Sequence, residues 1–304
     1  MARVLYKPQS FIRRNLERLA AIEPILTDYA RQRLTLTVRQ LHYQLVARGL
    51  QANTPQLYKS LSELVSNARN AGLIDWEMIE DRGRNLMDWA KWSTPEAFLS
   101  DQQGVYFSDL WAGQPTRVEV WTEKTAVSGI LRPVCARHQV PFFSASGINS
   151  TSEMRAAAER FIKHHATGQH VVVLFITDHD PTGIWMEDDT RGRLSLYARR
   201  AVDVRRIGLT FDQVQTLRLP PNTGKEADTR MPDYRARFGF TDTWELDAVE
   251  PRLLAQMVDD AVIELRDDDL WTEALERQEI ESEEVDDCLQ TALENLPDTM
   301  REPT

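Results

Sequence analysis

An aspartate pair closes the most apolar segment of the chain, where residues 170–177 (HVVVLFIT) run into the sequence DHDPTG. Such an apolar run is typical of the central strand of a parallel sheet that is covered on both faces. Open α/β sheets hold their ligands at the carboxyl ends of the strands, which is where Asp178 and Asp180 stand. Because neighbouring carboxylates repel each other, a divalent cation is the expected partner, and hard oxygen ligands suit magnesium. The alternative is structural, with Asp180 capping the helix that begins at Pro181 and Asp178 accepting from a loop amide.

A third acid, Glu123, favours the metal over the structural alternative. Glu123 closes a second predicted strand, residues 117–123 (RVEVWTE). In a parallel sheet its carboxylate lies on the same edge as Asp178 and Asp180, so that three carboxylates converge. The sequence contains no GxxxxGK[ST] phosphate-binding loop that would compete with this interpretation. The sequence therefore predicts a magnesium site at Glu123, Asp178 and Asp180, in which manganese could substitute.

The segments around these acids alternate between strands and helices. Further strands are expected at residues 140–146 and 202–210, and helices lie between the strands. This order predicts the α/β class, with a compact four-stranded unit and a parallel sheet. A polar loop (LPPNTGKEADTR, residues 219–230), a helix (residues 244–265) and an acidic helical tail follow. The chain is expected to divide into three parts: residues 1–95, 116–215 and 216–304.

Three predicted helices precede this unit. They cover residues 10–33, 35–49 and 54–72, and a strand at residues 73–81 follows them. The strand runs into a basic turn that holds Arg82 and Arg84. This is the order of a winged helix-turn-helix, which usually places its third helix in a DNA groove and its wing on phosphates. Small helical domains of this shape also serve as protein-docking modules.

Within the second of these helices, a tyrosine lies one turn after an arginine. Val38, Leu41 and Leu45 follow the spacing of a buried stripe. Tyr43 lies nearly opposite that stripe, and Arg39 lies on about the same face as Tyr43, at a spacing where side chains meet. A tyrosine hydroxyl becomes an effective nucleophile when a cation stabilises its phenolate, and a guanidinium also binds phosphate. Taken alone, the pattern fits an ordinary surface tyrosine as well.

The sequence WTEK at residues 121–124, followed by a β/α layer and an apolar strand that ends in DHDPTG, resembles the Toprim domain of topoisomerases, bacterial primases and several nucleases. This resemblance implies that Glu123, Asp178 and Asp180 bind magnesium that is used in phosphodiester chemistry. A winged helix with Arg-x-x-x-Tyr before a Toprim domain resembles the A subunit of topoisomerase VI and the related meiotic double-strand-break protein. In that family the tyrosine attacks DNA and becomes linked to a 5′ phosphate. By this resemblance Tyr43 is the nucleophile and Arg39 is the arginine before it.

The resemblance spans about residues 34–254, and two features depart from it. His42 stands where the family often has a second aromatic residue. The chain is also short, like the minimal single-subunit relatives of bacteria and mobile elements, and its sequence shows no ATPase domain. The resemblance implies a homodimer whose sites take Tyr43 from one chain and the metal acids from the other. Strand passage would require a separate ATPase subunit.

Charge is distributed unevenly along the chain. The 304 residues have a formal net charge of −11, yet residues 241–304 carry 21 acidic and 4 basic side chains. The first 240 residues are therefore basic, with a net charge of +6. A mildly basic body is compatible with binding to a polyanion such as duplex DNA, whereas the acidic tail is typical of a solvated helix. The side chains that we expect to contact DNA are Lys59, Arg82, Arg84, Lys124, Lys225 and Arg230.

Cysteine content and hydropathy bear on the cellular compartment. Two cysteines, Cys135 and Cys288, cannot form a disulfide framework or a four-ligand zinc site, which favours a reducing interior. No apolar run approaches the roughly 20 residues that span a bilayer, and the amino terminus lacks the apolar stretch of a signal peptide. We therefore expect a cytoplasmic protein without membrane contact.

Three functions follow from these observations. The leading hypothesis is magnesium-dependent DNA strand cleavage by tyrosine transesterification, with Tyr43, Arg39 and Glu123 as the catalytic residues. The second is a Toprim nuclease that hydrolyses DNA or RNA with the metal alone, as in defence against phages or plasmids. The third is a DNA-binding accessory protein without catalysis. Replacing Tyr43 with phenylalanine separates the first from the second, because only the first requires the hydroxyl.

Overall fold

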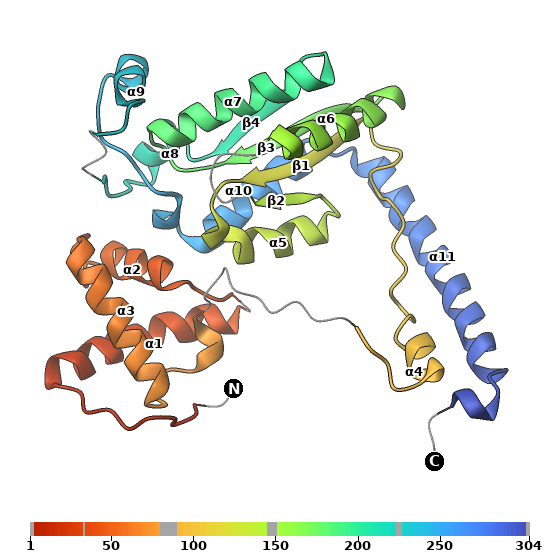
Figure 1. Ribbon diagram of the computed structural model, residues 1–304, viewed down its shortest axis with the longest axis horizontal. Coiled ribbons are helices and arrows are strands. Elements are labelled where there is room, and N and C mark those ends of the chain that lie inside the picture. Colours follow the sequence, from red (N-terminus) through yellow and green to blue (C-terminus); the bar gives the residue numbers. More distant parts are fainter. Residues whose placement is uncertain (1–2, 33, 80–89, 145–150, 223–226, 302–304) are drawn as a thin grey trace.

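A computed structural model describes residues 3–32, 34–79, 90–144, 151–222 and 227–301 of the chain. Figure 1 shows a small helical body at the amino-terminal end, a larger body built on a sheet, and a long helix that projects from the larger body. In the described ranges, no helix is both long and apolar enough to cross a membrane.

Three helices form the amino-terminal body: α1 (Arg13–Arg31), α2 (Val38–Ala47) and α3 (Pro55–Asn70). Their apolar stripes share one core, which includes Ile22, Leu41 and Leu61. The helix starts are encoded locally. The side chain of Thr37 accepts from the amide of Gln40 in a capping box at the start of α2, and Thr54 caps α3 with a proline at its first position.

A four-stranded, all-parallel sheet in the order β2-β1-β3-β4 is the base of the larger body. Its strands are β1 (Thr116–Thr122), β2 (Phe142–Ser144), β3 (His170–Ile176) and β4 (Asp203–Gly208). Thr122 pairs with Ile176, so the two central strands end at the same level. Glu123 and Thr177, the next residue of each chain segment, therefore lie at the same carboxyl edge of the sheet.

Helices cover both faces of this sheet (Figure 1). On one face, Val172, Leu174 and Ile176 pack with α5 (Ser128–Arg137) and α10 (Pro251–Glu264). On the other face, the alternate residues of β3 pack with α6 (Thr151–Ala166) and α7 (Pro181–Ala198). Side chains of a strand point to opposite faces in turn, so a strand that is covered twice must be apolar throughout. This explains the apolar run that precedes the aspartate pair.

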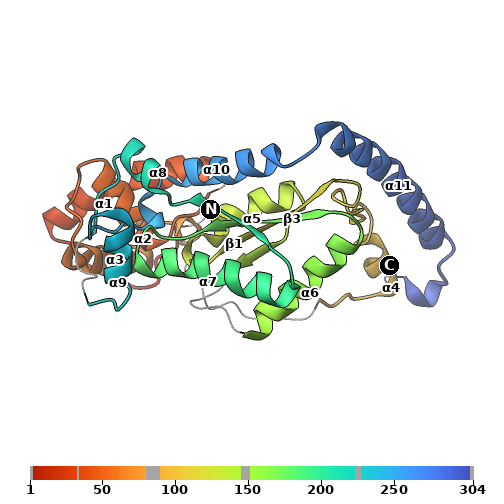
Figure 2. The ribbon, with the colours of Figure 1, turned by 90° about the horizontal axis from the view of Figure 1, so that it is seen from above.

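Short elements connect β4 to the carboxy-terminal helices: α8 (Phe211–Thr216), α9 (Met231–Phe238) and η3 (Leu246–Ala248). The 27-residue α11 (Asp268–Glu294) then leaves the body and runs beside α4 (Pro95–Ser100), as Figures 1 and 2 show. Trp271, near the start of α11, anchors the helix in the core, where its ring meets that of Trp111 at 5.7 Å between centroids. Most of the residues after Ala274 are exposed or half-buried.

The α/β class and the parallel sheet are confirmed, whereas the structure differs from the expected local structure in two segments. Within residues 73–79, the expected strand is replaced by the 3₁₀ turn η1 (Trp76–Met78), and Ile79 makes a single bridge with Leu36. The carboxylate of Asp75 accepts from the amide of Glu77 at 3.0 Å and closes this turn. The helix expected from residue 244 begins only at Pro251, where Glu250 caps it.

The segment that was expected as a separate extension belongs to the sheet-based body. Leu246, Leu254 and Val258 pack in the same core as β1 and β3. These three residues therefore help to hold the carboxy-terminal segment against the sheet.

Candidate functional site

The two aspartates of DHDPTG follow directly after β3, and each carboxylate accepts a hydrogen bond from a backbone amide. Asp178 Oδ1 accepts from the amide of Leu246 at 2.7 Å, and Asp180 Oδ1 accepts from the amide of Gly183 at 2.6 Å, which caps α7. Both structural roles considered for these residues are therefore present. A carboxylate can accept several hydrogen bonds and also coordinate a cation, so these roles are compatible with a metal site.

Gly183 allows α7 to begin directly beside the end of β3. A Cβ atom at this position would lie 2.3 Å from the carbonyl oxygen of Asp178 and 2.8 Å from Thr177 Oγ1. The first of these neighbours is backbone and cannot move aside cheaply. The glycine of the motif is therefore required by the close approach of two chain segments, and it fixes the spacing between the two aspartates.

Glu123 lies close enough to both aspartates to be affected by their charges. Burial, followed by the charges of Asp178 and Asp180, raises the pKa of Glu123. The charges of the two aspartates thus act on Glu123, and a bound cation would relieve such repulsion. Among the described residues, no group of three or more aspartate, glutamate, histidine or cysteine side chains is placed so that it could hold a metal ion.

Lys124 supplies positive charge to this edge. Its Nζ atom lies 2.9 Å from Asp178 Oδ1, 3.3 Å from Glu245 Oε2 and 3.0 Å from Asp247 Oδ2. Burial alone would lower the pKa of Lys124, but Asp178, Asp247 and Glu245 together raise it. The ammonium group is therefore charged and sits at the base of the site. It joins the end of β3 to the segment at residues 245–247.

Asp247 is the most unusual carboxylate of the site. Its side chain is 0% exposed, and within the described part of the chain neither of its oxygens has a hydrogen-bond partner. Its contacts with Lys124 and with Arg39 Nε, at 3.0 and 3.3 Å, are ion pairs without hydrogen-bond alignment. Burial, which Lys124 opposes and Asp178 reinforces, raises the pKa of Asp247. Lys124 and Arg39 are therefore the two cations that balance this buried carboxylate.

Arg39 and Tyr43 reach the same segment from α2. The Arg39 guanidinium bonds to Glu245, the residue that also pairs with Lys124. Tyr43 is only 4% exposed, and its hydroxyl accepts from Asn222 Nδ2 at 3.3 Å. Burial, reinforced by the charge of Glu245, raises the pKa of Tyr43, while Asn222, Arg39 and Lys124 oppose the rise. Arg39, Tyr43 and Asp178 thus belong to one electrostatic network within one chain, joined through Glu245 and Lys124.

A chain of polar contacts positions the tyrosine. His42 Nε2 contacts Asn53 Oδ1 at 3.2 Å, and Asn53 Nδ2 donates to Asn222 Oδ1 at 2.9 Å. Asn222 then donates to Tyr43. The histidine that stands where the resembling family often has an aromatic residue is therefore buried and tied to the nucleophile candidate.

Two hollows meet at this network. The first, of about 350 Å³, is lined by Tyr43, Asn53 and Asn222 and bordered by Arg39 and Tyr58. The second, of about 490 Å³, shares Arg39 and Tyr58 and continues along α3. Tyr43 thus lines a concave surface that Arg39 and Tyr58 connect to a second one.

The remaining residues expected to bind DNA are dispersed. Lys59 is exposed on α3, and Lys124 lies in the ion-pair network. Arg230 covers the ring of Trp185 at 4.5 Å and lies 3.6 Å from Asp228, which in turn accepts from Thr182 beside the aspartate pair. Arg82, Arg84 and Lys225 lie outside the described residues.

Four residues of the site were not singled out for chemistry from the sequence: Asn53, Asn222, Glu245 and Asp247. Backbone pairing brings the last two to the acids, since His179 and Trp244 exchange two hydrogen bonds of 2.9 Å in an antiparallel bridge. One signal was available. Glu245 and Asp247 are two residues apart, as Asp178 and Asp180 are, and they follow an apolar tryptophan.

In comparisons with known proteins, no protein-family model, no curated protein and no solved structure matches the chain.

Proposed function

We propose that this protein cleaves DNA with Tyr43 as the nucleophile and magnesium at Glu123, Asp178 and Asp180. The observation that carries the proposal is the continuous network from the arginine and tyrosine of α2 through Glu245 and Lys124 to Asp178. The resemblance of the two motifs to the winged helix and Toprim domain of the topoisomerase VI A subunit supports it.

The donor set fits magnesium in its chemistry. The charges of Asp178 and Asp180 help to raise the pKa of Glu123, and the buried carboxylate of Asp247 lies beside Lys124 in the same network. Magnesium takes hard oxygen ligands and keeps several waters, so a cluster of carboxylates is a suitable environment. When bound, the ion would stabilise negative charge on the phosphate and on the departing oxygen. Lys124 would have to leave Asp178 for this carboxylate to bind the ion.

The chain's own residues then account for the covalent step. Arg39 releases Glu245 and binds the scissile phosphate in its place. A guanidinium pairs with phosphate through two parallel hydrogen bonds. The Tyr43 oxygen forms a bond to phosphorus, the bond from phosphorus to the 3′ oxygen breaks, and the 3′ oxygen takes a proton from water and leaves as a hydroxyl. The carboxylate whose charge acts most on Tyr43 is that of Glu245, and we assign the phenol proton to it. The product is a 5′-phosphotyrosine.

The decisive experiment is a search for covalent protein–DNA adducts with labelled duplex DNA and magnesium, denatured before electrophoresis. The native chain is expected to form the adduct and Tyr43→Phe to form none. Tyr58→Phe is the matched control, because Tyr58 lines the same hollow without a hydrogen bond to Asn222 among the contacts described. Adducts formed equally by Tyr43→Phe would refute the assignment of the nucleophile.

A second function is favoured by one observation. Tyr43 is 4% exposed and its pKa is raised, which are unfavourable properties for a nucleophile. Hydrolysis of DNA or RNA by the metal site alone would need no tyrosine. In that case cutting persists in Tyr43→Phe, no adduct forms, and Glu123→Gln abolishes cutting. A non-catalytic accessory protein would bind DNA and cut in none of these variants.

We further propose a homodimer, because a duplex has two strands and two-fold symmetry supplies two equivalent sites. The structure brings Tyr43 into the network of its own chain, whereas the resemblance implies sites that are shared between chains. Mixing Tyr43→Phe with Glu123→Gln chains distinguishes the two. Shared sites leave one intact site in each mixed dimer, which nicks duplex DNA, and sites within single chains leave none. Resealing with strand passage would need a separate ATPase subunit.

A further inference from the structure

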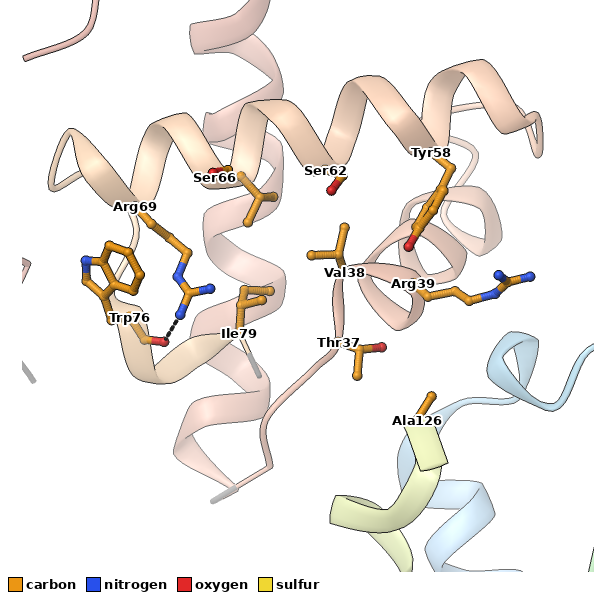
Figure 3. Close-up of a pocket in the computed structure, with 11 residues that line it drawn as sticks. Thr37, Val38, Arg39, Tyr58, Ser62, Ser66, Arg69, Trp76, Ile79 and Ala126 are labelled. Carbon is orange, nitrogen blue, oxygen red and sulfur yellow. Dashed lines mark hydrogen bonds between the residues drawn. The ribbon is translucent and has the colours of Figure 1, made fainter. Parts of the chain in front are cut away.

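The hollow of about 490 Å³ that continues from the tyrosine is a second feature that calls for a ligand. Figure 3 shows it between α3 on one side and the start of α2, Ile79 and Ala126 on the other. Ser62 and Ser66 of α3 line it, and Arg39 and Tyr58 at one end connect it to the hollow of Tyr43.

Both ends of this hollow carry an arginine beside an aromatic ring. At the end near Tyr43, the Arg39 guanidinium carbon lies 5.9 Å from the centre of the Tyr58 ring. At the far end, the Arg69 guanidinium carbon lies 4.3 Å above the Trp76 ring, and Arg69 donates to the carbonyl oxygen of Trp76 at 2.7 Å. Two cations that flank hydroxyl groups and aromatic surface are the features by which proteins hold single-stranded nucleic acid.

The position of α3 does not suit reading of a paired duplex. A helix that reads bases must stand clear of the protein, because its full diameter of about 10–12 Å enters a major groove about 12 Å wide. Here Ser62 and Ser66 face the hollow, and Ala126 of the sheet-based body lies across from them (Figure 3). This face of α3 is recessed, so a single strand can reach it more easily than a duplex.

We infer that this hollow binds one unpaired nucleotide of the strand that Tyr43 attacks, next to the scissile phosphate. Arg39 and Arg69 contact the phosphates on either side, the base lies against the ring of Tyr58, and the hydroxyls of Ser62 and Ser66 bond to its edge. A hollow of this volume is of the size that holds one ligand of roughly nucleotide dimensions. This inference rests on the proposed function and specifies its substrate as DNA with an unpaired position beside the cut.

Fluorescence anisotropy of labelled DNA with the native full chain, without divalent cations so that no cutting occurs, tests the inference. A duplex with one unpaired adenine is expected to bind about tenfold more tightly than the same duplex fully paired, which is typical for stacking of one base. An abasic residue in place of the unpaired adenine is expected to remove this preference without any change to the protein. Equal affinity for the paired and unpaired duplexes would overturn the inference.

Variants of α3 locate the effect. Ser62→Leu combined with Ser66→Leu fills the hollow and is expected to abolish the preference for the unpaired duplex. Ser60→Leu is the matched control on the same helix. Ser60 is exposed, does not line the hollow, and accepts a hydrogen bond of 2.9 Å from Arg18. A preference that survives the double substitution would also overturn the inference. If the native chain forms covalent adducts but binds paired and unpaired duplexes equally, only the nucleotide site is refuted. If it prefers the unpaired duplex but forms no adducts, only the proposed cleavage is refuted.

Discussion

Replacement of Gly183 with alanine tests the packing that places the two aspartates. The new Cβ would lie 2.3 Å from the carbonyl oxygen of Asp178, at a distance where one of the two segments must move. Forcing an additional methyl group into a packed site costs about 1–3 kcal/mol. The movement would also disturb the hydrogen bond of 2.6 Å from the amide of residue 183 to Asp180. We therefore expect a loss of stability together with weaker magnesium binding.

Gly192 offers a matched control in the same helix. It is exposed in α7, and a Cβ there would meet no atom within 4 Å. Alanine is more favourable than glycine inside a helix by roughly 0.5–1 kcal/mol, so Gly192→Ala is expected to stabilise the protein. Gly183→Ala gains the same helix propensity, so the free energies of unfolding of the two variants should differ by the steric cost alone, about 1–3 kcal/mol.

Urea denaturation followed by tryptophan fluorescence measures this difference. The comparison uses the same substitution in the same helix, so that changes in helix propensity and in the unfolded chain largely cancel. A midpoint for Gly183→Ala equal to or above that of Gly192→Ala would refute the close approach. The motif would then have no steric requirement for glycine at position 183.

Three further outcomes are expected. Asp178→Asn should greatly weaken the binding of magnesium or manganese in calorimetry, and isotherms identical to those of the native chain would contradict the metal site. Burial lowers the pKa of His179 to about 4, so between this value and its ordinary 6.5 the unfolded chain binds more protons. Stability should therefore rise with pH over this range, by roughly 3 kcal/mol, and His179→Phe should flatten the slope in acid-unfolding curves. Removing residues 279–304, with nine acidic side chains and one basic one, retains Trp271. It should preserve or strengthen DNA binding that weakens with salt, and loss of binding by the folded, truncated chain would contradict DNA binding by the basic body.

Local signals in the sequence predicted the elements that local interactions determine. Thr37 and Thr54 cap their helices through their own side chains, and the apolar run after residue 169 forms the central strand. The alternating pattern around Trp76 was misleading, because the buried Asp75 closes a turn there. Alternation alone does not reveal that a side chain accepts from the backbone two residues later.

Long-range contacts determined what the sequence did not reveal about the site. Tyr43 lies opposite the apolar stripe of α2, as predicted, yet it is buried, because Asn222 and Glu245 come from segments about two hundred residues away. Helical periodicity shows which side chains leave their own core, and it does not show what covers them. Glu245 and Asp247 reach the acids only through the backbone bridge at Trp244, and no local pattern encodes such a bridge.

The bridge between His179 and Trp244 also sets the order in which a growing chain can assemble this site. During synthesis the amino-terminal segments leave the ribosome first and begin to fold before the rest is made. Tyr43, Arg39 and the aspartate pair are therefore exposed to the cell well before Glu245 and Asp247 exist. Until translation has passed Asp247, Arg39 lacks both of its ion-pair partners at this site and Lys124 lacks two of its three. Under the proposed function, a nascent chain carries the nucleophile without the clamp that positions it, and the ability to break DNA arises only when about four-fifths of the chain has been made.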